Sequence, residues 1–176
     1  MAISGLVITY NEEKNIGKCI DALFEVCDEV IIVDSLSADN TVKIAEEKGA
    51  KVISQKFLGD GPQRTHGLPF CKNDWILNLD ADEFLDTDAK EFILKEKYLE
   101  GDYDAFSFRV KNFLADELID FSGWYPDHKV RFFNKKTAQP SPAKVHQKIE
   151  TTNEKKVAVH ILHYGWESFE QIIAKK

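Results

Sequence analysis

Short apolar runs and amphipathic stretches alternate along the first half of the chain. The apolar runs lie at residues 5–9, 29–33, 51–54 and 75–79. Each run is short and continuous, which predicts a strand that is buried on both faces. Residues 15–26 and 41–48 instead carry apolar side chains at helical spacing. Strands and helices in this order predict right-handed β-α-β units and a parallel sheet.

The second half of the chain has a different pattern, with alternating apolar residues and several prolines between the alternating stretches. The predicted elements are strands at 105–110, 129–133 and 160–164 and a helix at 167–175. We expect these strands to extend the first sheet. The fold class is therefore α/β, one domain over residues 1–176 with a mixed, mainly parallel central sheet flanked by helices.

Polar residues follow three of the predicted strands, at positions 10–13, 34–37 and 80–83. Ligands of open parallel sheets bind beyond the carboxyl ends of the strands, so these positions are the first candidates for a site. No G-x-G-x-x-G or G-x-x-x-x-G-K-[ST] sequence follows any predicted strand. This absence argues against a dinucleotide-dependent oxidoreductase and against a P-loop kinase.

Carboxylates crowd into residues 79–83, Leu-Asp-Ala-Asp-Glu, at the end of an apolar strand. Such groups repel one another unless a cation neutralises them, which favours an oxygen-ligand site for Mn²⁺ or Mg²⁺. A metal bound there would keep coordination positions for phosphate oxygens. The alternative is a helix start, in which Asp82 or Asp86 accepts hydrogen bonds from backbone N–H groups before a helix at 89–98.

Asp34 ends the second predicted strand at the same edge of the sheet. Its carboxylate could accept a hydrogen bond from a nucleobase N–H group or a ribose hydroxyl. Tyr10 could stack on a base while Asn11 and Glu12 contact its polar edge, although the same residues could also begin a helix. Asp39 and Thr41 are typical of a turn and a helix cap.

The composition excludes several classes of protein. A length of 176 residues, with 43% hydrophobic and 30% charged residues, fits one globular domain. The net charge is −7, divided into −9 for residues 1–100 and +2 for residues 101–176, which argues against a nucleic-acid-binding protein. The division could mark a metal-binding first half and an anion-facing second half. Three cysteines without C-x-x-C spacing predict free thiols.

The chain begins directly with an apolar strand and has no signal-peptide pattern. Its apolar runs are far shorter than the roughly 20 residues that a membrane-spanning helix needs. We expect a cytoplasmic protein whose membrane contact is at most peripheral, at the inner face of the membrane.

Three motifs together resemble one family. They are Ile8-Thr9-Tyr10-Asn11-Glu12-Glu13, then Val33-Asp34-Ser35 followed by Asp39 and Thr41, then Leu79-Asp80-Ala81-Asp82-Glu83. In this order they resemble the inverting family-2 glycosyltransferases with the Rossmann-like GT-A fold. The chain is similar to the small bacterial branch related to lipopolysaccharide-core β-glucosyltransferases. Supporting sequences are Gly61-Pro62-Gln63-Arg64, Trp124-Tyr125-Pro126-Asp127, Arg131-Phe132-Phe133, Val145-His146 and Leu162-His163-Tyr164.

The resemblance implies a nucleoside-diphosphate sugar as donor, UDP-linked, and a glycan or lipid-linked acceptor. Residues 1–100 would bind the donor and residues 101–176 the acceptor, with a C-terminal segment of the family lacking here. The donor-binding residues that the resemblance implies are Thr9, Tyr10, Asn11, Glu12, Asp34, Gln63, Arg64, Asp80 and Ala81. Asp82 is the preferred metal ligand and Asp80 a second candidate. His163, in the last predicted strand, is a third candidate, for a metal or a diphosphate contact.

An inverting transferase needs a general base for the acceptor hydroxyl. We favour Asp127, because it follows a turn whose aromatic residues are suited to stacking on sugar rings. Glu117 and Asp120 are the alternatives. Arg131 and His146 are further candidates for diphosphate contacts. Two other functions stay open: a nucleotidyltransferase, and a non-catalytic module that binds nucleotide sugars.

Overall fold

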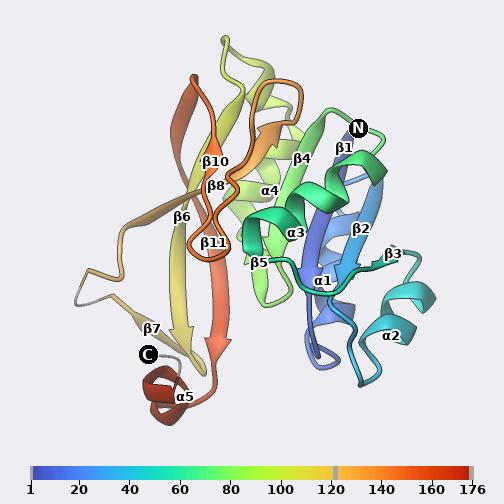
Figure 1. The fold of residues 1–176 in the computed structure, drawn as a ribbon. Helices are drawn as coiled ribbons and strands as arrows, with labels where there is room; N and C mark the ends of the chain where they lie inside the picture. The colour runs from blue at the N-terminus through green and yellow to red at the C-terminus, as the bar shows by residue number, and fades with distance from the viewer. Residues whose placement is uncertain (1, 121–122, 175–176) are drawn as a thin grey trace.

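One mixed sheet of nine strands runs through the molecule, in the order β3-β2-β1-β4-β8-β6-β11-β5 with β7 paired to β6 (Figure 1). The structure is a computed structural model that describes residues 2–120 and 123–174. The strands of the sheet are β1 (Ile3–Thr9), β2 (Glu29–Asp34), β3 (Lys51–Ser54), β4 (Trp75–Asp80), β5 (Glu83–Leu85), β6 (Ala105–Leu114), β7 (Glu117–Ile119), β8 (Asp127–Asn134) and β11 (Glu154–Trp166). Two short strands, β9 (Gln139–Pro140) and β10 (Ile149–Glu150), form a separate ribbon.

Helices cover both faces of the sheet (Figure 1). They are α1 (Ile16–Phe24), α2 (Thr41–Glu47), α3 (Asp60–Gly67), α4 (Thr87–Leu94) and α5 (Phe169–Ala174), with 3₁₀ turns η1 (Leu68–Phe70) and η2 (Lys97–Leu99). Within the described residues, no helix is long and apolar enough to cross a bilayer.

Strands β3, β2, β1 and β4 are parallel to one another, as the sequence predicts. Beyond β4 the sheet is mixed: β8 is antiparallel to β4 and to β6, and β11 is parallel to β6. The carboxyl ends of β1, β2, β4, β6 and β11 therefore meet the start of β8 at one edge of the sheet. Strand order reverses at β1, which lies between β2 and β4, and such a reversal opens a crevice for ligands at this edge.

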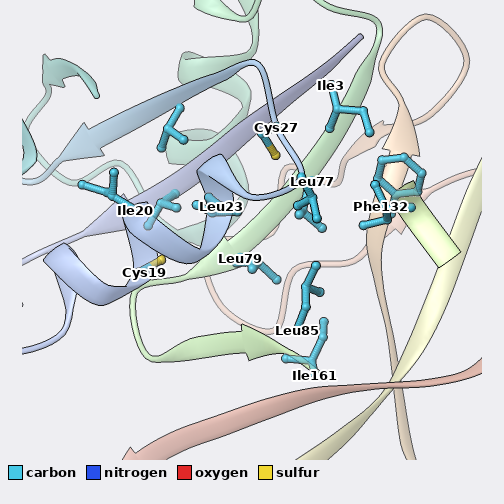
Figure 2. Packing of buried hydrophobic residues seen from close by; sticks show 14 of the residues in the cluster. Ile3, Cys19, Ile20, Leu23, Cys27, Leu77, Leu79, Leu85, Phe132 and Ile161 are labelled. Atoms are coloured by element: carbon cyan, nitrogen blue, oxygen red, sulfur yellow. The ribbon is translucent and has the colours of Figure 1, made fainter. Parts of the chain in front are cut away.

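Alternate side chains of β2 enter two different apolar clusters. Val30 and Ile32 belong to the cluster that includes apolar residues of α1 and α4, whereas Ile31 and Val33 belong to a second cluster on the opposite face. Figure 2 shows part of the first cluster, to which α1 and the strands β1, β4, β8 and β11 contribute side chains. Because both faces are covered, the parallel strands carry continuous apolar runs, and this is why the sequence predicts them well.

Helix α3 was not predicted from the sequence, and its composition explains why. Its eight residues, Asp-Gly-Pro-Gln-Arg-Thr-His-Gly, include two glycines and a proline and have no apolar stripe. Close packing holds the helix instead. A Cβ on Gly67 would lie 2.6 Å from side-chain atoms of Leu6 and Val33, and a Cβ on Gly61 would lie 2.0 Å from the carbonyl oxygen of Ser141.

Other differences from the sequence predictions are smaller. The helix expected at 89–98 ends at Leu94, because Glu96 has a left-handed backbone with φ 52°. The strand expected at 160–164 covers 13 residues and contains two register shifts. Strands β5 and β7 were not predicted. The final helix is described only to Ala174, and Lys175 of its predicted range lies outside the described residues.

Candidate active site

A cavity of about 800 Å³ opens at the carboxyl edge of the sheet, where the strand order reverses. Residues that follow β1, β2, β3 and β4 line it, together with α3 and the end of β11. The lining residues are Ile8, Thr9, Tyr10, Glu12, Ser35, Leu36, Lys56, Phe57, Asp60, Arg64, Asp80, Ala81, Asp82 and His163. Eight sequence-predicted site residues are thus brought to one cavity: Thr9, Tyr10, Glu12, Arg64, Asp80, Ala81, Asp82 and His163.

Asp80 lies between two arginines. Arg64 donates a hydrogen bond of 2.5 Å to Asp80 Oδ1, and Arg131 lies 3.6 Å from Asp80 Oδ2. Burial alone would raise the pKa of Asp80, but the two guanidinium groups outweigh it and hold the pKa well below its usual range. Both oxygens of Asp80 therefore already face cations, which makes Asp82 the better candidate for a metal ligand.

Glu83 is not the free carboxylate that the acidic segment suggests. It is 1% exposed, and Arg131 donates two hydrogen bonds to it, of 2.9 and 2.7 Å. Arg131 is itself buried and is one of the residues that line the second cavity described below. Its guanidinium group holds Glu83 in a bidentate pair.

Asp82 and Asp86 were the two candidates for a helix cap, and in the structure Asp86 is the cap. Asp86 precedes α4, and its Oδ1 accepts a hydrogen bond of 2.8 Å from the backbone N–H of Ala89. Asp82 is consequently not the cap residue. Its carboxylate lies beside His163, with 3.4 Å between Asp82 Oδ2 and His163 Nε2.

Space for a cation exists next to His163. Gly165 leaves it open, because a Cβ there would lie 2.5 Å from His163 Nε2 and 3.3 Å from Asp82 Oδ2. Burial would lower the pKa of His163, but the Asp82 carboxylate raises it above its ordinary value. Among residues 2–120 and 123–174, no three His, Cys, Asp or Glu side chains converge as a ready metal site. Asp82 and His163 thus fit a cation that takes its other ligands from a bound substrate or water.

Three predicted donor-binding residues support the cavity walls without lining the cavity. Asp34 is 1% exposed, and its carboxylate accepts hydrogen bonds from the Ser37 backbone N–H and hydroxyl, of 2.9 and 2.5 Å. Asn11 accepts a hydrogen bond from the backbone N–H of Ala38. Gln63 is fully buried and donates to Ser35 Oγ at 3.2 Å. All three hold the turn after β2, whose Ser35 and Leu36 face the cavity.

A second cavity, of about 570 Å³, adjoins the first. The two share Asp60, Arg64 and Asp80 as lining residues. Asp127 lines the second cavity at the start of β8, with Lys129 Nζ 3.7 Å from its Oδ2. The second cavity is polar and carries groups of both charges, including Arg131, His146, Lys148, Glu154 and Lys156.

The structure separates Asp127 from the two alternative bases. Glu117 is exposed on β7, and Asp120 follows that strand, also exposed. Neither lines any of the cavities described here. Asp127 is therefore the candidate that shares a cavity with Asp80 and Arg64.

The aromatic turn before Asp127 packs against β11. Trp124 lies edge-on to Trp166 with ring centroids 5.0 Å apart, and Tyr125 stacks on His160 at 6.0 Å. His160 also contacts Asp86 Oδ2 at 3.2 Å. Since their rings are engaged within the protein, Trp124 and Tyr125 orient the turn that carries Asp127. His160 and His163 have different partners, and only His163 lines the first cavity.

Sequence reasoning missed Lys56, Phe57 and Asp60 as lining residues. A signal existed, because these residues follow the predicted strand at 51–54, and the rule applied to the other strand ends holds for this one too. Phe57 is 53% exposed and, with Tyr10 at 59% and Leu36 at 57%, gives the cavity a partly apolar rim.

The three cysteines are buried free thiols, as predicted. Burial raises the pKa of the Cys71 thiol to about 12, so it is protonated at neutral pH.

Comparison with known proteins shows similarity to glycosyltransferases. The model of the family "Glycosyl transferase family 2" matches residues 4–164. An uncharacterized glycosyltransferase of Rickettsia felis is 47% identical over 91 residues, which are 52% of this chain and 32% of that protein. The lipopolysaccharide core biosynthesis glycosyltransferase LpsC of Rhizobium meliloti is 35% identical over 98 residues, 53% of this chain and 36% of that protein. The chain thus spans about a third of the length of these curated relatives.

Among solved structures, residues 1–349 of S. aureus TarS in complex with UDP align with a TM-score of 0.50 and 27% identity, over 64% of this chain and 36% of that chain. The sheet order, the cavity at the strand reversal and the family match over 4–164 agree with one another. The fold is the GT-A fold expected from the sequence, and the chain belongs to glycosyl transferase family 2.

Proposed function

We propose that the chain transfers a sugar, with inversion, from a UDP-linked donor to a glycan or lipopolysaccharide-type acceptor, assisted by a divalent cation. One observation carries the proposal: two cavities meet at Asp60, Arg64 and Asp80. The first has the acidic and apolar lining suited to a nucleotide sugar. The second holds the Asp127 carboxylate. A transferase needs this arrangement, because donor and acceptor must meet at one point.

The similar proteins support the identities of donor and acceptor. TarS was solved with UDP, and LpsC is named for lipopolysaccharide core biosynthesis. In the proposed complex, the rim formed by Tyr10, Leu36 and Phe57 holds the base. Thr9, Glu12, Arg64 and Ala81 contact the ribose and diphosphate.

Asp82 and His163 would hold the cation, which when bound offsets the charge of the departing diphosphate. A carboxylate combined with an imidazole favours Mn²⁺ over Mg²⁺, because Mg²⁺ prefers oxygen ligands alone. Asp80 contributes differently, since Arg64 and Arg131 neutralise it and fix the start of the segment that carries Asp82.

Asp127 acts on the acceptor. As the acceptor hydroxyl oxygen bonds to the anomeric carbon, its proton passes to the Asp127 carboxylate, and the bond from that carbon to the diphosphate oxygen breaks. Attack from the side opposite the diphosphate inverts the anomeric centre. A general base of this kind contributes roughly 10²–10⁴-fold to the rate.

The proposal is tested by incubating the protein with UDP-sugars, Mn²⁺ and candidate glycan acceptors, and detecting products by mass spectrometry. A glycosylated acceptor with released UDP supports the proposal. Binding of UDP-sugars without transfer to any acceptor would favour the non-catalytic binding module instead.

Asp82→Asn is expected to weaken Mn²⁺-dependent UDP binding by at least about tenfold, because it removes a charged ligand from a site with few protein ligands. Isothermal titration of UDP with Mn²⁺ and with EDTA measures the effect. Asp88→Asn removes an exposed carboxylate on α4 and serves as the matched control. Equal UDP affinity in Mn²⁺ and in EDTA for the unmodified protein would reject the metal.

Asp34→Ala is expected to weaken UDP binding by about 1–3 kcal/mol, through loss of a base contact or of the turn that Asp34 holds. Ser37→Ala separates the two causes, because Ser37 provides both hydrogen bonds of Asp34 in this structure, one of them through its hydroxyl. If Ser37→Ala reproduces the loss, Asp34 acts through the turn. Unchanged binding in Asp34→Ala would place the nucleotide elsewhere.

A further inference from the structure

Asn112 is a buried polar residue that contacts His163 from outside the two cavities. It lies on β6 and is 7% exposed. Asparagine is depleted in strands, and a buried amide is costly unless it is hydrogen-bonded. Asn112 has two hydrogen bonds: its Oδ1 lies 2.7 Å from His163 Nδ1, and its Nδ2 donates to the backbone oxygen of Trp124 at 3.5 Å.

The strand register places Asn112 beside His163. In the parallel pair of β6 and β11, His163 is the direct partner of Asn112, and the register shifts immediately afterwards, before Trp166. Irregularities of this kind often re-aim side chains next to functional sites. Trp166 lies edge-on to the His163 ring at 5.0 Å, so the imidazole is held from two sides.

These contacts define which nitrogen of neutral His163 carries the proton. The Trp124 backbone oxygen can only accept, so the amide nitrogen of Asn112 faces it and the amide oxygen faces His163. An amide oxygen also only accepts, and it lies 2.7 Å from Nδ1, whereas the Asp82 oxygen lies 3.4 Å from Nε2. The shorter contact therefore places the hydrogen of the neutral ring on Nδ1. The lone pair is then on Nε2, which faces Asp82 and the space that Gly165 leaves open.

We propose that Asn112 is a positioning residue that holds His163 in the Nδ1–H tautomer and so presents Nε2 as a ligand for the cation. The inference rests on the proposed function, since it gives His163 a metal to bind. Asn112 does not touch the substrate or the cation. Its effect is indirect, as is common for the groups that hydrogen-bond to metal-binding histidines.

The same amide ties the donor side of the site to the acceptor side. Trp124, whose backbone oxygen receives the second hydrogen bond, lies three residues before Asp127. One side chain thus contacts both His163 and the turn before the proposed base.

The first test needs neither metal nor nucleotide. Two-bond ¹H–¹⁵N correlation spectra of the metal-free protein, at a pH where His163 is neutral, identify the tautomer directly. We expect Nδ1–H in the unmodified protein and in Asn112→Asp, which keeps an oxygen facing Nδ1. Asn112→Leu removes the acceptor and should lose the preference for Nδ1–H.

The second test measures Mn²⁺ affinity in the presence of UDP by isothermal titration. Asn112→Leu is expected to weaken Mn²⁺ binding about 10–100-fold, and Asn112→Asp to restore most of it. An Nε2–H tautomer in the unmodified protein would overturn the inference while leaving the proposed function intact. Unchanged Mn²⁺ affinity in Asn112→Leu would overturn it as well. If Mn²⁺ does not bind the unmodified protein at all, the metal assignment fails, and the role of Asn112 with it.

Discussion

Asp127→Asn is expected to lower the rate of sugar transfer by about 10²–10⁴-fold while leaving UDP affinity nearly unchanged. The substitution keeps the size and hydrogen-bonding capacity of the side chain but removes the proton acceptor. A general base acts in the transition state and contributes little to holding the donor. Transfer is measured as kcat with a glycan acceptor, and UDP binding by titration on the same preparation.

Glu117→Gln and Asp120→Asn are the matched controls, because both remove an exposed carboxylate outside the described cavities. Both should retain transfer. If one of them abolishes transfer while Asp127→Asn stays active, the base is that residue. Asp127 would then have only a binding role in the second cavity.

Arg131→Met is expected to lower the free energy of unfolding by about 3–5 kcal/mol. The methionine would leave the Glu83 carboxylate buried without its bidentate partner, and an uncompensated buried charge is strongly destabilising. Urea unfolding followed by circular dichroism measures the change.

Two further variants show whether the pair itself is responsible. The double substitution Glu83→Leu with Arg131→Met should recover most of the stability, because it removes both charges together. Lys136→Ala breaks the exposed ion pair with Asp74 and should cost no more than about 1 kcal/mol. A double variant as unstable as Arg131→Met would point to lost packing rather than to the unpaired carboxylate.

The parallel half of the sheet could be predicted because its strands are apolar on both faces and its helices are amphipathic. The three motifs at the ends of β1, β2 and β4 could be placed at one edge for the same reason, since parallel strands end together. Helix α3 could not be predicted, because contacts of Gly61 and Gly67 with distant residues hold it rather than an apolar stripe. Tertiary contacts of this kind override local propensity.

The roles of the individual acidic residues could not be predicted from the sequence either. The sequence shows three neighbouring carboxylates without their partners. In the structure, Glu83 is buried with Arg131, Asp80 lies between two arginines, and Asp82 adjoins His163. The partners come from positions 16 to 81 residues away in the chain, which no local spacing reveals. Asn112 was missed for the same reason, because its importance depends on the register of β6 and β11.

Contacts between α3 and residues 141–144 link the two halves of the chain, so neither half can be removed without exposing the other. The backbone N–H groups of Asp60 and Gly61 donate hydrogen bonds to the carbonyl oxygens of Lys144 and Ala143. In addition, β4 pairs with β8, and Arg131 donates hydrogen bonds to the buried Glu83 carboxylate. A fragment ending at residue 100 would expose an unpaired β4 edge, release the start of α3 and leave Glu83 as a bare buried charge. We therefore expect that residues 1–100 do not fold on their own, and that both halves of the chain melt in one cooperative transition.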